Sequence, residues 1–197
     1  EYNQKALSIE DKIKNLIIKH IKNPEAIILY GSAIQTNYTK YNDIDVLIIT
    51  KSKSWKTTGE KYKLISVLIG LAKENKLPLD IQIIDKETLY KQYPNNPSLI
   101  YQLNDHKAIY GQIRLPKENK ISSLDLSNIA DEDSDGNEIY HAIRNAILVK
   151  LLSQKIVDNI ILQRRLIEQL GLRILNNLKE NSASKPEKRI ALNYLKE

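Results

Sequence analysis

The sequence contains no cysteine, no phenylalanine and no methionine among its 197 residues. Without cysteine the chain can form neither disulfides nor thiolate metal sites, which suits the reducing cytoplasm. No apolar run approaches the ~20 residues that a membrane-spanning helix needs. The first ten residues include charged side chains and lack the apolar core of a signal peptide. We therefore expect a cytoplasmic protein whose core is built mainly from isoleucine, leucine and tyrosine.

Charge is distributed unevenly along the chain, although 27% charged and 42% apolar residues are typical of a globular protein. Residues 1–138 contain 19 basic and 19 acidic side chains, whereas residues 139–197 contain 11 basic and 5 acidic ones. Within the first of these segments, residues 116–138 contain 2 basic and 7 acidic side chains. The basic C-terminal segment could therefore face a polyanion such as RNA, the acidic segment of its own chain, or simply solvent.

The apolar pattern predicts an α/β unit followed by a helical unit. We expect a first domain at residues 1–114, an acidic linker at 115–138 and a C-terminal helical domain at 139–197. The expected strands are 26–30, 43–50, 79–84 and 108–110. The expected helices are one that starts at Ser8 and stops before Pro24, then 33–36, 60–76, 86–93, 97–104, 139–158, 159–180 and 188–196.

Two aspartates, Asp43 and Asp45, open one of the predicted strands. Residues two apart in a strand point to the same side, so their carboxylates can bind divalent metal ions between them. Mg²⁺ prefers such oxygen ligands, together with phosphates and water. Gly31 and Ser32 lie between an earlier strand and a short helix, where backbone N–H groups and the serine hydroxyl can bind an anion. The pattern predicts a nucleoside triphosphate held by its phosphates, with metal at the scissile bond.

A third carboxylate would complete such a site by orienting or deprotonating an attacking hydroxyl. The best candidate is Asp80, which lies between Leu79 and Ile81 at the start of the third predicted strand. Asp85 at the far end of that strand is better interpreted as the N-cap of the next helix.

These three elements, in this order and spacing, resemble the nucleotidyltransferase superfamily of DNA polymerase β. The similarity is greatest to small prokaryotic members, namely the minimal nucleotidyltransferases of toxin–antitoxin and abortive-infection systems and the antibiotic nucleotidyltransferases. It extends over residues 26–111. It implies an α+β fold, a mixed sheet with helices on one face, to which this chain adds a C-terminal helical bundle. It also implies two Mg²⁺ ions, with Mn²⁺ as an alternative, and transfer of a nucleoside monophosphate to a hydroxyl with release of pyrophosphate.

The resemblance assigns a role to each motif residue. Gly31 and Ser32 would hold the β- and γ-phosphates. Asp43 and Asp45 would bind metal, while Asp80 would bind the catalytic metal and activate the acceptor.

One departure from the family pattern concerns the charge of the triphosphate. Small relatives often have a basic residue soon after Gly-Ser, whereas this chain continues Ala-Ile-Gln. The missing positive charge must come from elsewhere in the chain. Lys63 is our candidate nucleotide-binding residue, with Lys40 and Lys51 as the alternatives.

The acceptor is predicted less directly than the reaction. Because the excess positive charge lies after residue 138, we favour a polyanion such as the 3′ end of a tRNA, then a protein hydroxyl, then a small molecule such as an aminoglycoside. Arg164-Arg165 and Lys188-Arg189 are candidate phosphate contacts, with solvated surface charge as the alternative. The rival hypothesis is a non-catalytic module of the same fold that binds an antitoxin or another partner protein.

Overall fold

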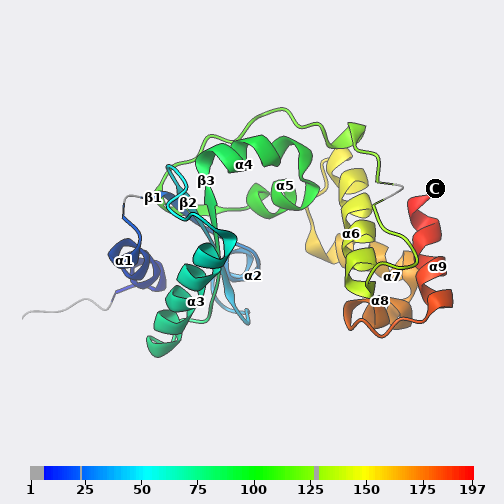
Figure 1. Ribbon diagram of the computed structural model, residues 1–197, viewed down its shortest axis with the longest axis horizontal. Coiled ribbons are helices and arrows are strands. Elements are labelled where there is room, and N and C mark those ends of the chain that lie inside the picture. Colours follow the sequence, from blue (N-terminus) through cyan, green and yellow to red (C-terminus); the bar gives the residue numbers. More distant parts are fainter. Residues whose placement is uncertain (1–6, 23, 127–128) are drawn as a thin grey trace, which may run out of the picture. The chain divides into compact units, whose positions relative to one another are not determined.

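The computed structural model describes residues 7–22, 24–126 and 129–197 (Figure 1). The chain divides into two compact units. The first comprises Glu1–Tyr93 and Gln102–Lys117, and the second comprises Pro94–Tyr101 and Glu118–Glu197. The acidic segment therefore packs largely with the C-terminal helices, in the second unit.

Strands are interspersed with helices up to residue 111, and among the described residues only helices follow. The strands are β1 (Pro24–Tyr30), β2 (Ile44–Thr50), β3 (Leu79–Asp85) and β4 (Lys107–Gly111). The helices are α1 (Ile9–His20), α2 (Ser32–Gln35), α3 (Thr58–Glu74), α4 (Lys86–Gln92), η1 (Tyr93–Asn95), α5 (Pro97–Asn104), η2 (Ile121–Ser123), α6 (Gly136–Ser153), α7 (Asn159–Leu170), α8 (Leu172–Lys179) and α9 (Lys185–Leu195). None of the helices in the described part of the chain is long and apolar enough to cross a membrane.

The four strands form one mixed sheet in the order β3-β2-β1-β4. β1 is antiparallel to both β2 and β4, while β2 is parallel to β3. A parallel pair needs a crossover connection, and α3 provides it between β2 and β3. The predicted mixed sheet is thus confirmed.

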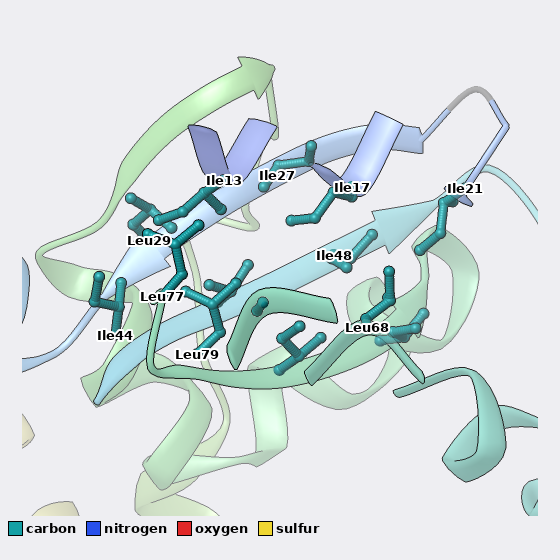
Figure 2. Close-up of a cluster of buried hydrophobic side chains, with 14 of the residues drawn as sticks. Ile13, Ile17, Ile21, Ile27, Leu29, Ile44, Ile48, Leu68, Leu77 and Leu79 are labelled. Atoms are coloured by element: carbon teal, nitrogen blue, oxygen red, sulfur yellow. The ribbon is translucent and has the colours of Figure 1, made fainter. Parts of the chain in front are cut away.

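One face of the sheet carries the main core of the first unit (Figure 2). Alternate residues of the strands point to this face, and α1 and α3 cover it with their apolar side chains. Fully buried members include Ile13, Ile17, Ile27, Ile48 and Leu68. Each such side chain contributes about 1.5–3 kcal/mol of hydrophobic free energy when it leaves water.

The other face of the central strands is also covered over part of its length. Ile28, Leu47 and Ile49 point away from the main core, yet each is at most 3% exposed. The short helix α4 contacts β2 and β3, and its Leu89 is fully buried. Asp80 on this face is exposed, so the cover does not extend to the start of β3.

Helix starts in the first unit follow the capping residues of the sequence. The Ser8 hydroxyl accepts from the Asp11 N–H at 3.1 Å at the start of α1. Asp85, which the sequence predicted as an N-cap, accepts from the Thr88 N–H at 3.0 Å at the start of α4. Each contact satisfies a backbone donor that the first helical turn leaves free.

The second unit is a bundle formed by α6, α7, α8 and α9. Fully buried side chains from all four helices form its core, among them Ile139, Ile143, Leu148, Leu162, Leu166, Leu178 and Ala191. The sequence predicted one continuous helix over 159–180, which is wrong. Gly171 separates α7 from α8, with φ at +75°, a conformation that a helix cannot contain and that glycine adopts without steric cost.

Two of the four predicted phosphate contacts bind the acidic segment of the chain itself. Lys188 donates from Nζ to the Ser134 carbonyl at 2.9 Å. Arg189 forms an ion pair with Glu132, with Nε and Oε1 2.9 Å apart. For these two residues, the structure supports the hypothesis that the basic C-terminal segment faces the acidic segment of its own chain.

Candidate active site

The candidate site begins with a row of three residues across the sheet. Tyr30 at the end of β1 pairs with Asp45 in β2, and Asp45 pairs with Asp80 in β3. Paired residues of neighbouring strands project to the same face. This is the face opposite to the core under α1 and α3. The register therefore brings together two predicted aspartates that lie 35 positions apart in the sequence.

Asp43 lies just before this row, because β2 begins at Ile44 and not at Asp43 as predicted. The Ile44 N–H donates to the Pro78 carbonyl at 2.8 Å and fixes the start of the strand beside β3. Asp43 is exposed, and its charge acts on Asp45. All three predicted carboxylates therefore contribute to one electrostatic environment.

Asp45 is the partly buried acid of this group, whereas Asp43 and Asp80 are exposed. Burial, followed by the negative charges of Asp80 and Asp43, raises the pKa of its carboxyl to about 6. Like charges that face one another without a counterion disfavour ionisation. A cation between these carboxylates would remove that penalty.

Tyr30 is a site residue to which the sequence pattern assigned no role. Its side chain is 6% exposed, and burial together with the charges of Asp45 and Asp80 raises the pKa of its hydroxyl. It thus forms one wall beside the carboxylates. Its position next to Gly31 was visible in the sequence, but its pairing with Asp45 depends on the strand register.

Gly31 forms the turn between β1 and α2. Its φ of +78° is a backbone conformation that side chains with a Cβ rarely adopt. A Cβ on this residue would collide with the Asp45 carboxylate, at Oδ2. Ser32 follows at the first position of α2 and is exposed. The turn therefore runs directly against the acidic row.

The loop after α2 is held by short-range hydrogen bonds. The Thr36 hydroxyl donates to the Ser32 carbonyl at 2.8 Å and accepts from the Lys40 N–H at 3.2 Å. Farther along, the Tyr38 hydroxyl donates to Glu10 Oε1 on α1 at 2.8 Å. These contacts fix the path of the chain toward Asp43 and hold the backbone of Lys40 within this loop.

The structure does not bring Lys63 to the carboxylates. Lys63 is exposed on α3, whose Leu64 and Leu68 pack on the opposite face of the sheet. The sequence could not reveal this, since the face of the sheet that α3 covers is a tertiary property. Lys63 is therefore left out of the nucleotide site.

The two alternative lysines differ in their distance along the chain from the acidic row. Lys51 follows the last residue of β2, whereas Asp45 is the second residue of that strand. Lys51 thus lies beyond the opposite end of β2 from the carboxylates. Lys40, in the loop that leads to Asp43, is the remaining lysine candidate.

The residues present fit a magnesium ion whose coordination shell is completed by phosphate oxygens of the substrate. Within the described residues, no three histidine, aspartate or glutamate side chains form a preformed metal cage. Mg²⁺ is commonly bound by one or two carboxylates together with phosphates and water. Asp43, Asp45 and Asp80 offer oxygen ligands of this kind, and their mutual repulsion favours a bound cation. Phosphate oxygens would then supply the remaining ligands.

The raised pKa of Asp45 predicts how stability depends on pH without metal. The folded state retains the Asp45 proton up to about pH 6, whereas an unfolded aspartate loses it near pH 4. The folded state therefore binds more protons in this window, and the Asp45 contribution to stability falls as pH rises through it. We expect Asp45→Asn to be more stable than wild type by on the order of 1–2 kcal/mol at pH 7.5 after allowance for solvent screening.

Urea unfolding in EDTA at pH 5 and at pH 7.5 measures this difference. It should be small at pH 5 and larger at pH 7.5, and added Mg²⁺ should reduce it by stabilising the wild type. A difference that stays constant with pH would contradict the assigned electrostatics.

Comparison with known proteins agrees with this fold. Residues 11–106 match the model of the family described as Polymerase beta, Nucleotidyltransferase. A crystal structure of spectinomycin adenyltransferase AAD(9) from Enterococcus faecialis, with ATP and spectinomycin, is similar at 19% identity and a TM-score of 0.55. The match covers 94% of this chain and 97% of that chain, and at this identity it establishes the fold alone.

A more distant similarity involves a toxin–antitoxin complex. A structure of a tri-AMPylated Shewanella oneidensis HEPN toxin with an MNT antitoxin matches at 20% identity, over 52% of this chain and 70% of that chain. Its TM-score of 0.34 is too low to support an inference. No curated protein matches the chain significantly. At residues 11–106 the chain therefore contains a nucleotidyltransferase domain of the polymerase β type.

Proposed function

We propose that the protein transfers a nucleoside monophosphate from a nucleoside triphosphate to an acceptor hydroxyl, releases pyrophosphate, and requires Mg²⁺. Mn²⁺ is the expected substitute. The observation that carries this proposal is the convergence of Asp43, Asp45 and Asp80 beside the Gly31 turn. These three carboxylates repel one another and lie next to the backbone turn. Such an arrangement is suited to binding a triphosphate together with its metal ion.

Each residue has a proposed part in the reaction. The turn at Gly31 and Ser32 binds the β- and γ-phosphates through backbone N–H groups and the serine hydroxyl. Asp43 and Asp45 hold metal, and Asp80 holds the catalytic metal and accepts the proton of the acceptor hydroxyl. The acceptor oxygen bonds to the α-phosphorus while the α–β phosphoanhydride bond breaks. When bound, Mg²⁺ would neutralise the charge on the transferred and leaving phosphate oxygens.

Two acceptor classes are favoured by separate observations. The excess of basic over acidic side chains in residues 139–197 favours a polyanion, such as the 3′ end of a tRNA. The fold shared with the spectinomycin adenyltransferase over both units favours a small hydroxylated molecule of the aminocyclitol class. The first is our primary proposal, because it rests on residues of this chain.

Transfer of labelled nucleotide tests the proposal. Wild-type protein is incubated with each α-labelled nucleoside triphosphate, Mg²⁺, and either total tRNA or spectinomycin. We expect label in tRNA, none in EDTA, and a loss on the order of 10²–10³-fold with Asp80→Asn. Asp105→Asn makes the same chemical change at an exposed aspartate outside the site and should leave transfer unchanged.

Each contrary outcome has a distinct meaning. If only spectinomycin is labelled, the acceptor is a small hydroxylated molecule and the tRNA proposal is wrong. No transfer to any acceptor by folded, metal-supplied protein would overturn the proposed reaction. Full activity of Asp80→Asn would overturn the role given to that carboxylate.

A further inference from the structure

A small pocket of about 200 Å³ lies in the second unit between α6, α7 and α9. Its polar lining includes Lys150 and Gln154 from α6 and Arg165 and Gln169 from α7. Each pair is four residues apart, so both members lie on the same face of their helix. Each of the two helices therefore contributes one cationic and one amide side chain to the pocket lining, and Tyr194 of α9 also lines it.

The pocket carries positive charge that is not neutralised. None of its lining residues is acidic. Lys150 lies over the Tyr194 ring, with Nζ 4.8 Å from the ring centroid, a contact that holds the ammonium group without cancelling its charge. Within the described parts of the chain, neither Lys150 nor Arg165 forms an ion pair.

Two other basic residues of the same unit do form ion pairs. Arg173 pairs with Glu187, with Nε and Oε2 3.6 Å apart, and Arg189 pairs with Glu132. Glu168 lies one helical turn after Arg165 on α7, and among the described residues the two still make no ion pair. Lys150 and Arg165 are thus available to an anion from outside the chain.

We propose that this pocket binds a backbone phosphate of a polynucleotide acceptor. An arginine fork can bind two phosphate oxygens, a lysine adds a point charge, and the two glutamines add amide donors. A volume of about 200 Å³ is smaller than the ~300–1,000 Å³ of typical small-ligand sites, so it suits one phosphate of a larger molecule. The same charge would repel a cationic aminoglycoside. The identification of the ligand as the acceptor rests on the proposed function.

Binding of a fluorescent single-stranded RNA tests the pocket directly. Anisotropy is measured with the full chain, without nucleotide or Mg²⁺, over a range of salt concentrations. The double variant Lys150→Gln with Arg165→Gln should bind RNA on the order of 10-fold more weakly at ~0.1 M salt. Because it removes two phosphate-contacting charges, the slope of log K against log salt should fall by about 1.4.

Arg164→Gln is the matched control. Arg164 is the neighbouring residue on α7, is exposed, and does not line the pocket. It should change RNA affinity by less than about 2-fold, whereas Arg165→Gln alone should weaken binding several-fold. Equal losses for the two arginine variants, or no loss for the double variant, would overturn the proposal. Thermal melting verifies that the exposed substitutions leave the fold intact.

Inorganic phosphate distinguishes the source of the phosphate group. At constant ionic strength, a few millimolar phosphate should not displace the RNA if the pocket recognises a polynucleotide. Displacement at that concentration would assign the pocket to free phosphate and overturn the proposal. Nucleotidyl transfer is assayed separately, so an RNA-binding pocket in a protein that labels only spectinomycin would refute the acceptor without altering the binding result.

Discussion

Asp45→Asn is expected to lower the rate of nucleotidyl transfer on the order of 10³-fold, because it removes the carboxylate at the centre of the site. Asp45 pairs with Tyr30 on one side and Asp80 on the other. Asparagine has nearly the same shape and retains one carbonyl oxygen, so the strand register should be preserved. The loss therefore reports charge and metal binding, and steady-state kinetics with varied Mg²⁺ measures it.

The same variant should be more stable than wild type in EDTA at neutral pH, as the raised pKa of Asp45 requires. Loss of activity with a gain in stability is expected for a residue kept for function and not for folding. Asp105→Asn should show neither effect. Residual transfer within about 10-fold of wild type at saturating Mg²⁺ would contradict the assignment of Asp45 as a metal ligand.

Gly31→Ala is expected to reduce transfer on the order of 10²-fold, because it displaces the phosphate-binding turn from the carboxylates. The backbone at Gly31 has φ at +78°, and the added Cβ would collide with Asp45 Oδ2. Either the turn or the carboxylate must move. The change should raise the KM for the nucleoside triphosphate and lower kcat together, since phosphate binding and metal geometry depend on the same contact.

Gly70→Ala provides the matched control for this substitution. Gly70 lies within α3, and a Cβ at this position meets no atom within 4 Å. Alanine there should leave activity unchanged and increase stability by about 0.5–1 kcal/mol, because it favours the helix. Unchanged transfer in Gly31→Ala would show that the turn does not position the phosphates.

Local sequence patterns determined most of the elements of this protein. The strands at β1, β2 and β3 were predicted within two residues of their observed ends, because short apolar runs bounded by polar residues are typical of buried strands. Ser8 and Asp85 identified helix starts through hydrogen bonds to residues three positions ahead. The pattern of Gly31-Ser32 with three aspartates also led to the nucleotidyltransferase family, because that chemistry needs these side chains at fixed distances.

Only the tertiary structure decided which of these residues meet. Strand register placed Tyr30 beside Asp45, and the packing of α3 on the opposite face separated Lys63 from the site. In the folded protein, Lys188 and Arg189 bind the acidic segment. Lys150 and Arg165, which line the pocket of the second unit, form no ion pair with any described residue. The sequence by itself determines the helices and strands, because they depend on contacts between residues that are close in the chain. The partners of a charged side chain are set by contacts between distant segments, which form only when the elements pack.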